Sequence, residues 1–327
     1  MSPTASHTSA ALALVSDDMH EVDLVIAKRL GSGVPLIGQV SQYILAAGGK
    51  RIRPALLLLI CGALSCQQTQ RFNLAAVVEF IHTATLLHDD VVDESTLRRG
   101  RATANETFGN PASVLVGDFL YSRAFQMMVE SGEMRVMEIL AEATNVIAEG
   151  EVLQLMNMHD ASLGAEGYLR VIRSKTAKLF EASARLGAVL AKVPAELEEA
   201  CATYGQALGT AFQVIDDVLD YDGDASLMGK NLGDDLREGK ATLPLILAMQ
   251  RGTAAQASLI RQAIETGGLD HLEAIVAIVR QTGSLDAARA TATLEAQRAI
   301  HALANLPPST YKDALLQLAS QLLYRRV

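Results

Sequence analysis

Residues 78–105 read VEFIHTATLLHDDVVDESTLRRGRATAN, an apolar helical pattern that runs into an aspartate cluster, Asp89-Asp90-x-x-Asp93. The second half of the chain repeats this arrangement as Asp216-Asp217-x-x-Asp220. Carboxylates four positions apart share one helix face, and they repel each other unless a cation lies between them. Such oxygen ligands suit Mg²⁺, which binds one or two carboxylates and takes its other ligands from water and substrate phosphates. Two facing clusters therefore predict a magnesium-dependent clamp for a diphosphate.

The composition predicts a fold made of helices. Among the 327 residues 50% are apolar, only 4% are aromatic, and tryptophan is absent. A core rich in Ala, Leu, Ile and Val is typical of packed helices. Helical periodicity continues from Asp17 to the end of the chain, including one long helix over 165–191, and strand-like alternation is nearly absent. We expect a flexible tail over 1–17 and, over 18–327, a single all-α bundle with its active site in a central cavity.

Charge and cysteine content exclude several classes of protein. The net charge of −9 argues against binding to nucleic acid and against a polybasic membrane anchor. Three cysteines without paired spacing suit a reducing compartment. The longest apolar run, 55–61, is too short to span a bilayer, and the first residues lack the basic region of a targeting peptide. We expect a soluble, cytoplasmic protein without a membrane span.

Two arginines follow the first cluster. Arg98 and Arg99 can bind phosphate oxygens through their guanidinium groups, while the carboxylates reach the same phosphates through metal. A site with both features can bind a diphosphate and stabilise it as a leaving group. A single cluster of this kind could also be a solvated helix end with mixed charges, an alternative that the second cluster disfavours.

The second cluster forms a polar stripe on an otherwise apolar helix, since Gln213, Asp216, Asp217 and Asp220 follow the spacing i, i+3, i+4, i+7. Buried carboxylates are costly, so the stripe must face metal, ligand or water. The polar segment 222–239 follows directly. Lysines in and beside this segment could close over bound phosphates, namely Lys230 and Lys240.

Three further positions give weaker signals. The junction Gly48-Gly49-Lys50-Arg51-Ile52-Arg53 offers positive charge for a second anion, although an ordinary basic helix junction is the alternative. His82 precedes Asp89 by two helical turns and so lies on roughly the same face. Lys175-Thr176 lies on an expected helix, where a surface lysine is the default reading.

These motifs together resemble the trans-isoprenyl diphosphate synthases of the polyprenyl synthetase family. The resemblance is carried by 78–105, 113–128, 145–157 and the region from Gly209 to Leu245, and extends over essentially the whole chain from about residue 18. It is strongest to the long-chain branch and implies an isoprenoid-synthase-type helical bundle. The implied reaction ionises an allylic diphosphate such as farnesyl diphosphate, adds isopentenyl diphosphate to the cation, and removes a proton.

The resemblance also assigns roles to residues of this sequence. It implies that Mg²⁺ is held by Asp89, Asp93 and Asp216, with Asp90, Asp217 and Asp220 in support. It implies that isopentenyl diphosphate is bound by Lys50, Arg53, His82 and Arg99. It implies that the allylic diphosphate is bound by Arg98, Lys175, Thr176, Gln213, Lys230 and Lys240. The expected catalytic set is Asp89, Asp93, Lys175, Asp216 and Lys240.

Product length depends on the helix wall beneath the first cluster. Ala84 and Thr85 lie about one turn before Asp89, where the growing hydrocarbon must pass. Bulky aromatics near these positions stop the chain in short-chain relatives, whereas both residues here are small. We therefore expect a long product, although ordinary helix packing would also explain small residues. The resemblance to the long-chain branch implies that this product is octaprenyl diphosphate for a quinone side chain. We expect the floor of the tunnel near Phe125, Met127 or Met128.

Other functions remain as alternatives. A shorter or longer prenyl synthase, from geranylgeranyl to decaprenyl, would need only a different tunnel. A terpene cyclase would carry a different second metal motif and an aromatic-rich pocket. A non-catalytic subunit of a heteromeric prenyl synthase would generally lack one or both aspartate clusters. We expect a homodimeric enzyme with small-molecule substrates.

Overall fold

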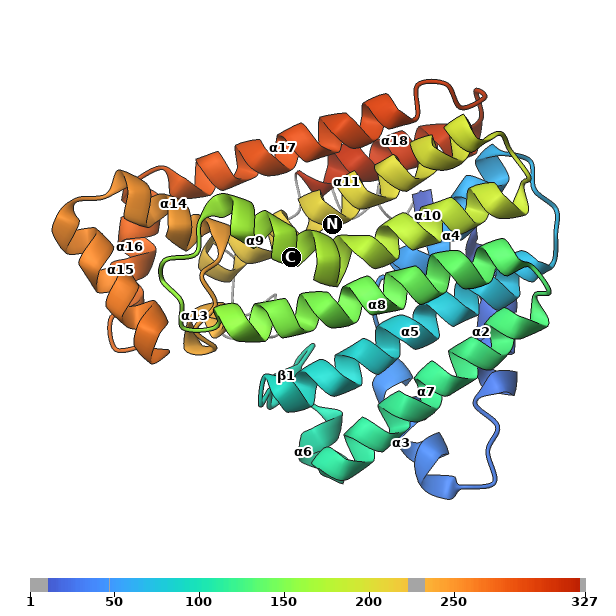
Figure 1. The fold of residues 1–327 in the computed structure, drawn as a ribbon, viewed down its shortest axis with the longest axis horizontal. Helices are drawn as coiled ribbons and strands as arrows, with labels where there is room; N and C mark the ends of the chain where they lie inside the picture. The colour runs from blue at the N-terminus through green and yellow to red at the C-terminus, as the bar shows by residue number, and fades with distance from the viewer. Residues whose placement is uncertain (1–10, 47, 223–232, 324–327) are drawn as a thin grey trace.

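The protein is almost entirely helical in a computed structural model, which describes residues 11–46, 48–222 and 233–323 (Figure 1). The elements are α2 (Ser16–Arg29), α3 (Pro35–Ala46), α4 (Ile52–Ala63), α5 (Gln70–Val92), β1 (Leu97–Arg98), β2 (Arg101–Ala102), α6 (Ala104–Phe108), α7 (Asn110–Glu130), α8 (Met134–Asn157), α9 (Ala165–Ile172), the π-helix η1 (Arg173–Ala177), α10 (Lys178–Leu190), α11 (Ala195–Asp222), α13 (Asp234–Arg237), α14 (Leu243–Arg251), α15 (Ala254–Thr266), α16 (Leu272–Gln281), α17 (Ser284–Ala302) and α18 (Thr310–Leu322).

The apolar run of 55–61 forms the central helix, α4. Its side chains are buried on all sides, and the helix contacts α5, α10 and α18. A helix that is apolar all round must lie inside a bundle or a membrane. Within the described part of the chain, no helix combines the length and apolarity that crossing a bilayer requires.

Two apolar cores are joined by one long helix, α11. The first core contains residues of α2 to α8, α10 and α18, and the second contains residues of α9 and α13 to α17. Leu208 of α11 belongs to the first core, whereas Val214 and Val218 belong to the second. The single 28-residue helix therefore connects both halves of the bundle.

The two aspartate clusters lie at the same end of parallel helices. Helices α5 and α11 run in the same direction, and both end on the side where β1 and α13 lie (Figure 1). Asp93 is the C-cap residue of α5, and Asp220 lies two residues before the end of α11. Helix C-termini carry partial negative charge. The fold thus adds two negative helix ends to two clusters of carboxylates.

The long helix expected over 165–191 is present without a break, but it contains a π-helical turn, η1, between α9 and α10. Neighbouring backbones approach this turn closely. A Cβ on Gly150 of α8 would lie 2.8 Å from the Lys175 backbone nitrogen, and one on Gly209 of α11 would lie 2.7 Å from Ala177 Cα. Isolated π-turns often occur at functional sites, and this one carries Lys175 and Thr176.

The N-terminal boundary also differs from the expected one. Residues 1–10 lie outside the described residues, but Ala11 and Val15 are already buried in the first core. The packed body therefore begins before residue 18. The short hairpin β1–β2 and the short helices α6 and α13 had no recognisable signal in the periodicity.

Candidate active site

A cavity of about 920 Å³ lies where the C-terminal ends of α5 and α11 meet η1, α8 and α13. Most of the residues singled out in the sequence line it: Lys50, Arg53, His82, Thr85, Asp89, Asp93, Arg98, Arg99, Lys175, Thr176, Gln213, Asp216, Asp217 and Lys240. Three others, Ala84, Asp90 and Asp220, are buried and do not line it. Lys230 lies outside the described residues.

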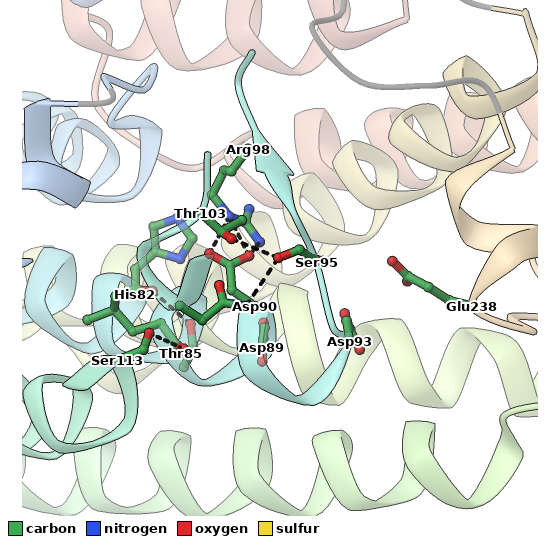
Figure 2. A network of polar contacts seen from close by, with 12 residues as sticks. His82, Thr85, Asp89, Asp90, Asp93, Ser95, Arg98, Thr103, Ser113 and Glu238 are labelled. Carbon is green, nitrogen blue, oxygen red and sulfur yellow. Dashed lines mark hydrogen bonds and ion pairs between the residues drawn. The ribbon is translucent and has the colours of Figure 1, made fainter. Parts of the chain in front are cut away.

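Asp89 and Asp93 face the cavity from the last turn of α5 (Figure 2). The Asp89 Oδ2 atom is 3.7 Å from Lys175 Nζ, and the Asp93 Oδ2 atom is 3.1 Å from Lys240 Nζ. Burial raises the pKa of Asp89, and Lys175 opposes that shift. The two lysines therefore balance two carboxylates that would otherwise repel each other.

Two glutamates that the sequence reasoning missed complete this arrangement. Glu151 of α8 lies 2.6 Å from Lys175 Nζ, and Glu238 accepts a hydrogen bond from Lys240. Both glutamates line the cavity, and Glu238 lies opposite Asp93 in Figure 2. Glu151 could not have been found from spacing, because nothing in the sequence places α8 against the π-helix.

Asp90 holds the hairpin rather than facing the cavity. Its carboxylate accepts hydrogen bonds from Arg98 Nε at 2.9 Å and from Arg98 Nη2 at 2.7 Å (Figure 2). Both turn residues, Arg99 and Gly100, have positive φ values of 54° and 72°, as a type I′ hairpin turn requires. The turn folds Arg98 back over Asp90, which is 1% exposed. The expected role of Asp90 beside a metal does not match this position.

The second cluster divides in a similar way. Asp216 and Asp217 both line the cavity, but Asp217 is largely buried and accepts hydrogen bonds from the Tyr168 hydroxyl at 2.5 Å and from Gln213 Nε2 at 2.8 Å. Burial raises the pKa of Asp217 to about 8. Thr176 Oγ1 donates to Gln213 Oε1 at 3.1 Å, so the orientation of the Gln213 amide is fixed from both sides. No motif or spacing in the sequence pointed to Tyr168.

Asp220 also differs from its expected place beside a metal. Its side chain is 1% exposed, and its Oδ2 atom accepts the backbone N–H of Asp235 at 3.4 Å. It therefore contacts the first turn of α13 rather than the cavity. The spacing i, i+7 correctly places Asp220 on the same helix face as Gln213. It cannot show that α13 covers the turn of α11 that carries Asp220.

A second group of basic residues lies on the α4 side of the cavity. Arg53 Nη1 lies 3.1 Å from His82 Nε2, and the Arg53 guanidinium stacks over Phe180 at 4.5 Å from the ring centroid. Burial, followed by the charge of Arg53, lowers the pKa of His82 well below its usual value. The neutral imidazole therefore accepts the arginine N–H. A Cβ on Gly49 would lie 2.7 Å from Arg99 Nη1, so the missing side chain at Gly49 leaves room for the Arg99 guanidinium. With Lys50, these groups place a cluster of basic side chains on this side of the cavity.

One of the two residues predicted to control product length lines the cavity. Thr85 lines the cavity, but Ala84 is fully buried in the first core, where a large side chain would overpack it. The expected tunnel floor does not match either, because the lining includes no residue of α7, the helix that carries Phe125, Met127 and Met128. The apolar lining includes Leu86, Ile147, Leu179, Phe180 and Phe212.

The carboxylates fit a metal ion whose coordination shell is completed by substrate oxygens and water. Among the described residues, no three acidic, histidine or cysteine side chains converge on one point. Asp89, Asp93 and Asp216 nevertheless face one cavity from two helices. Mg²⁺ needs only one or two carboxylates when phosphate oxygens and water supply the rest.

Comparison with known proteins identifies the family. A family model described as polyprenyl synthetase matches residues 34–280. The octaprenyl diphosphate synthase of Escherichia coli strain K12 is 53% identical over 307 residues, which cover 94% of this chain and 95% of that protein. The chain belongs to the polyprenyl synthetase family. The resemblance and the prenyltransferase class predicted from the motifs are thereby confirmed.

Solved structures of the polyprenyl synthetase family confirm the fold class. A polyprenyl synthase from Caulobacter crescentus CB15, complexed with calcium and isoprenyl diphosphate, has a TM-score of 0.94 at 45% identity, with 98% of each chain covered. Product length varies among relatives. An all-trans-nonaprenyl-diphosphate synthase of Rhodobacter capsulatus, described as specific for geranyl diphosphate, is 48% identical, with 94% of each chain covered.

The position of Asp90 predicts a structural role that can be separated from chemistry. Asp90→Asn should lower the free energy of unfolding by about 3 kcal/mol, because it leaves the Arg98 guanidinium without its buried carboxylate. Urea denaturation followed by circular dichroism measures this change. Glu138→Gln is the matched control, since it removes the exposed ion pair with Arg135 (side-chain exposures of 57% and 48%), and it should leave stability nearly unchanged. Equal stability of the two variants would contradict the assignment.

Proposed function

We propose that the protein is a Mg²⁺-dependent, long-chain all-trans-polyprenyl diphosphate synthase that makes octaprenyl diphosphate, the precursor of a quinone side chain. It would extend an allylic diphosphate such as farnesyl diphosphate with successive isopentenyl diphosphate units. The observation that carries the proposal is one cavity lined by aspartates from both clusters and by a separate group of basic residues. The octaprenyl diphosphate synthase at 53% identity supports the product.

Each side of the cavity has its own part in the proposed reaction. Arg98, Lys175 and Lys240 bind and orient the allylic diphosphate, and Asp89, Asp93 and Asp216 would hold Mg²⁺. The metal, when bound, neutralises charge on the departing diphosphate, the electrostatic contribution that dominates in such reactions.

The second substrate binds on the opposite side. Lys50, Arg53, His82 and Arg99 hold isopentenyl diphosphate so that its double bond faces the allylic carbon. The oxygens of Thr176 and Gln213 face the allylic cation, and the apolar wall excludes water that would capture it. The proton lost after bond formation passes to the released diphosphate.

The proposal extends to assembly and location. Helices α7 and α8 leave large apolar side chains exposed, among them Met134 at 72% and Met156 at 75%. Val152, Leu155 and Met156 share one face of α8. Large exposed apolar patches mark protein interfaces, and we assign this one to a homodimer. The free cysteines Cys61, Cys66 and Cys201 support a cytoplasmic location.

Incubation of the purified protein with Mg²⁺, farnesyl diphosphate and isopentenyl diphosphate tests the function. Mass spectrometry should show octaprenyl diphosphate as the main product. Chelation of the metal should abolish it, and Asp89→Asn or Asp216→Asn should reduce turnover by at least about 100-fold, because each removes a metal-binding charge. No product from the wild-type chain would favour the non-catalytic subunit, and a cyclic hydrocarbon would favour a cyclase.

The position of Thr85 predicts control of product length. Thr85→Phe should shift the product to shorter prenyl chains, because the ring would fill the cavity along the hydrocarbon path. Thr85→Ala is the control, and its products should match those of the wild type. The product distribution by mass spectrometry decides the matter, and identical distributions for both variants would exclude Thr85 from the path.

The homodimer can be tested by light scattering coupled to size exclusion. The wild-type protein should elute with twice the mass of one chain. Replacing Leu155 and Met156 by Glu should give a folded monomer, because charge would then line the interface. Leu294 of α17 is exposed to a similar degree, at 67%, and Leu294→Glu should leave the dimer intact. A monomeric wild type, or a dimer unaffected by the α8 changes, would refute the assignment.

A further inference from the structure

Both lysines of the cavity are held in the same way. Each ammonium group lies between an aspartate of the first cluster and a glutamate from a different element. Lys175 lies 3.7 Å from Asp89 and 2.6 Å from Glu151. Lys240 lies 3.1 Å from Asp93 and closer to Glu238. In both cases the glutamate is the nearer partner.

Packing of the surrounding elements holds both glutamates beside their lysines. Glu151 follows Gly150, whose missing Cβ lets α8 lie directly against the Lys175 backbone. The side chains of Glu238 and Glu151 are 11% and 29% exposed, and those of Lys175 and Lys240 are both 18% exposed. Lysine–carboxylate pairs at this depth are held by packing on both sides, whereas exposed pairs contribute little.

The electrostatic consequence concerns the first aspartate cluster. Without its glutamate, each lysine would have one close carboxylate left, Asp89 or Asp93. A tighter lysine–aspartate pair would compete with a divalent cation for the same oxygens. It would also turn the ammonium group away from the space that a diphosphate must enter.

We infer that Glu151 and Glu238 are positioning residues that draw Lys175 and Lys240 away from the first aspartate cluster, leaving that cluster available to metal and the ammonium groups available to diphosphate. The inference rests on the proposed function for its metal and its substrate. It assigns the two glutamates a role through the lysines rather than as metal ligands.

The same helices provide a matched control. Glu142 of α8 contacts Lys178 of α10 at 2.9 Å, with a side-chain exposure of 67% for the glutamate. Neither residue lines the cavity. Glu142→Gln therefore removes a glutamate–lysine pair between α8 and α10, one helical turn from Lys175, without touching the first cluster.

The test measures binding of Mg²⁺ with inorganic pyrophosphate by calorimetry, together with the Mg²⁺ dependence of turnover. Glu151→Gln and Glu238→Gln should each raise the Mg²⁺ concentration at half-saturation about fivefold, the change that an ion-pair difference of about 1 kcal/mol produces. Turnover at saturating Mg²⁺ should stay near the wild-type value. Glu151→Asp should retain more affinity than Glu151→Gln, and Glu142→Gln should behave as wild type.

A double-mutant cycle separates positioning from direct ligation. In a Lys175→Met background, Glu151→Gln should no longer weaken binding, because the residue through which it acts is gone. Lys240→Met with Glu238→Gln gives the corresponding cycle. Weakened binding that persists in these backgrounds would identify the glutamates as metal ligands and overturn the inference.

The remaining outcomes are also decisive. Wild-type metal dependence in both glutamine variants, or lost turnover with unchanged metal dependence, would overturn the inference and leave the proposed function intact. An inactive wild-type protein would refute the proposed function. The pyrophosphate calorimetry would then still decide whether the glutamates act through the lysines.

Discussion

Accumulated negative charge at one end of the bundle is the constraint on which the site depends. Two parallel helices end together, each with a cluster of carboxylates near its negative C-terminus. Such an arrangement is stable only when cations are close. The chain meets this need with Lys175, Lys240 and Arg98, and the elements that carry them are the ones that depart from regular helix: the π-helix, the segment after α13 and the hairpin.

The carboxylates within each cluster have separate tasks. In the first, Asp89 and Asp93 face the cavity while Asp90 is bound by Arg98. In the second, Asp216 faces the cavity while Asp217 accepts hydrogen bonds from Tyr168 and Gln213. Adjacent residues on a helix point in directions about 100° apart, so neighbouring aspartates cannot all reach one ion. The repeated motif therefore combines groups that face the ligand with groups that hold neighbouring elements.

Sequence periodicity was sufficient for the helices that carry the clusters. The two apolar helical patterns that carry the aspartate clusters correspond to α5 and α11. Long apolar repeats give strong local signals of this kind. Contacts between elements that are far apart in the sequence leave no such local signal. The roles of Glu151 and Tyr168 depend on contacts of this kind, so the sequence could not reveal them. Ala84 and Thr85 are both small and adjacent, and only the packing of α5 shows which of them reaches the cavity.

The π-helix explains how one stretch of chain can belong to two cores. Tyr168 and Ile172 before it pack in the second core, whereas Leu179 and Phe180 after it pack in the first. A π-turn closes its hydrogen bonds over five residues instead of four, so the apolar stripe after it is out of phase with the stripe before it. The chain thereby changes the side on which it packs without a loop. Lys175 and Thr176 lie in the turn where the apolar stripe of α9 ends and that of α10 has not yet begun. Their side chains therefore belong to neither apolar core.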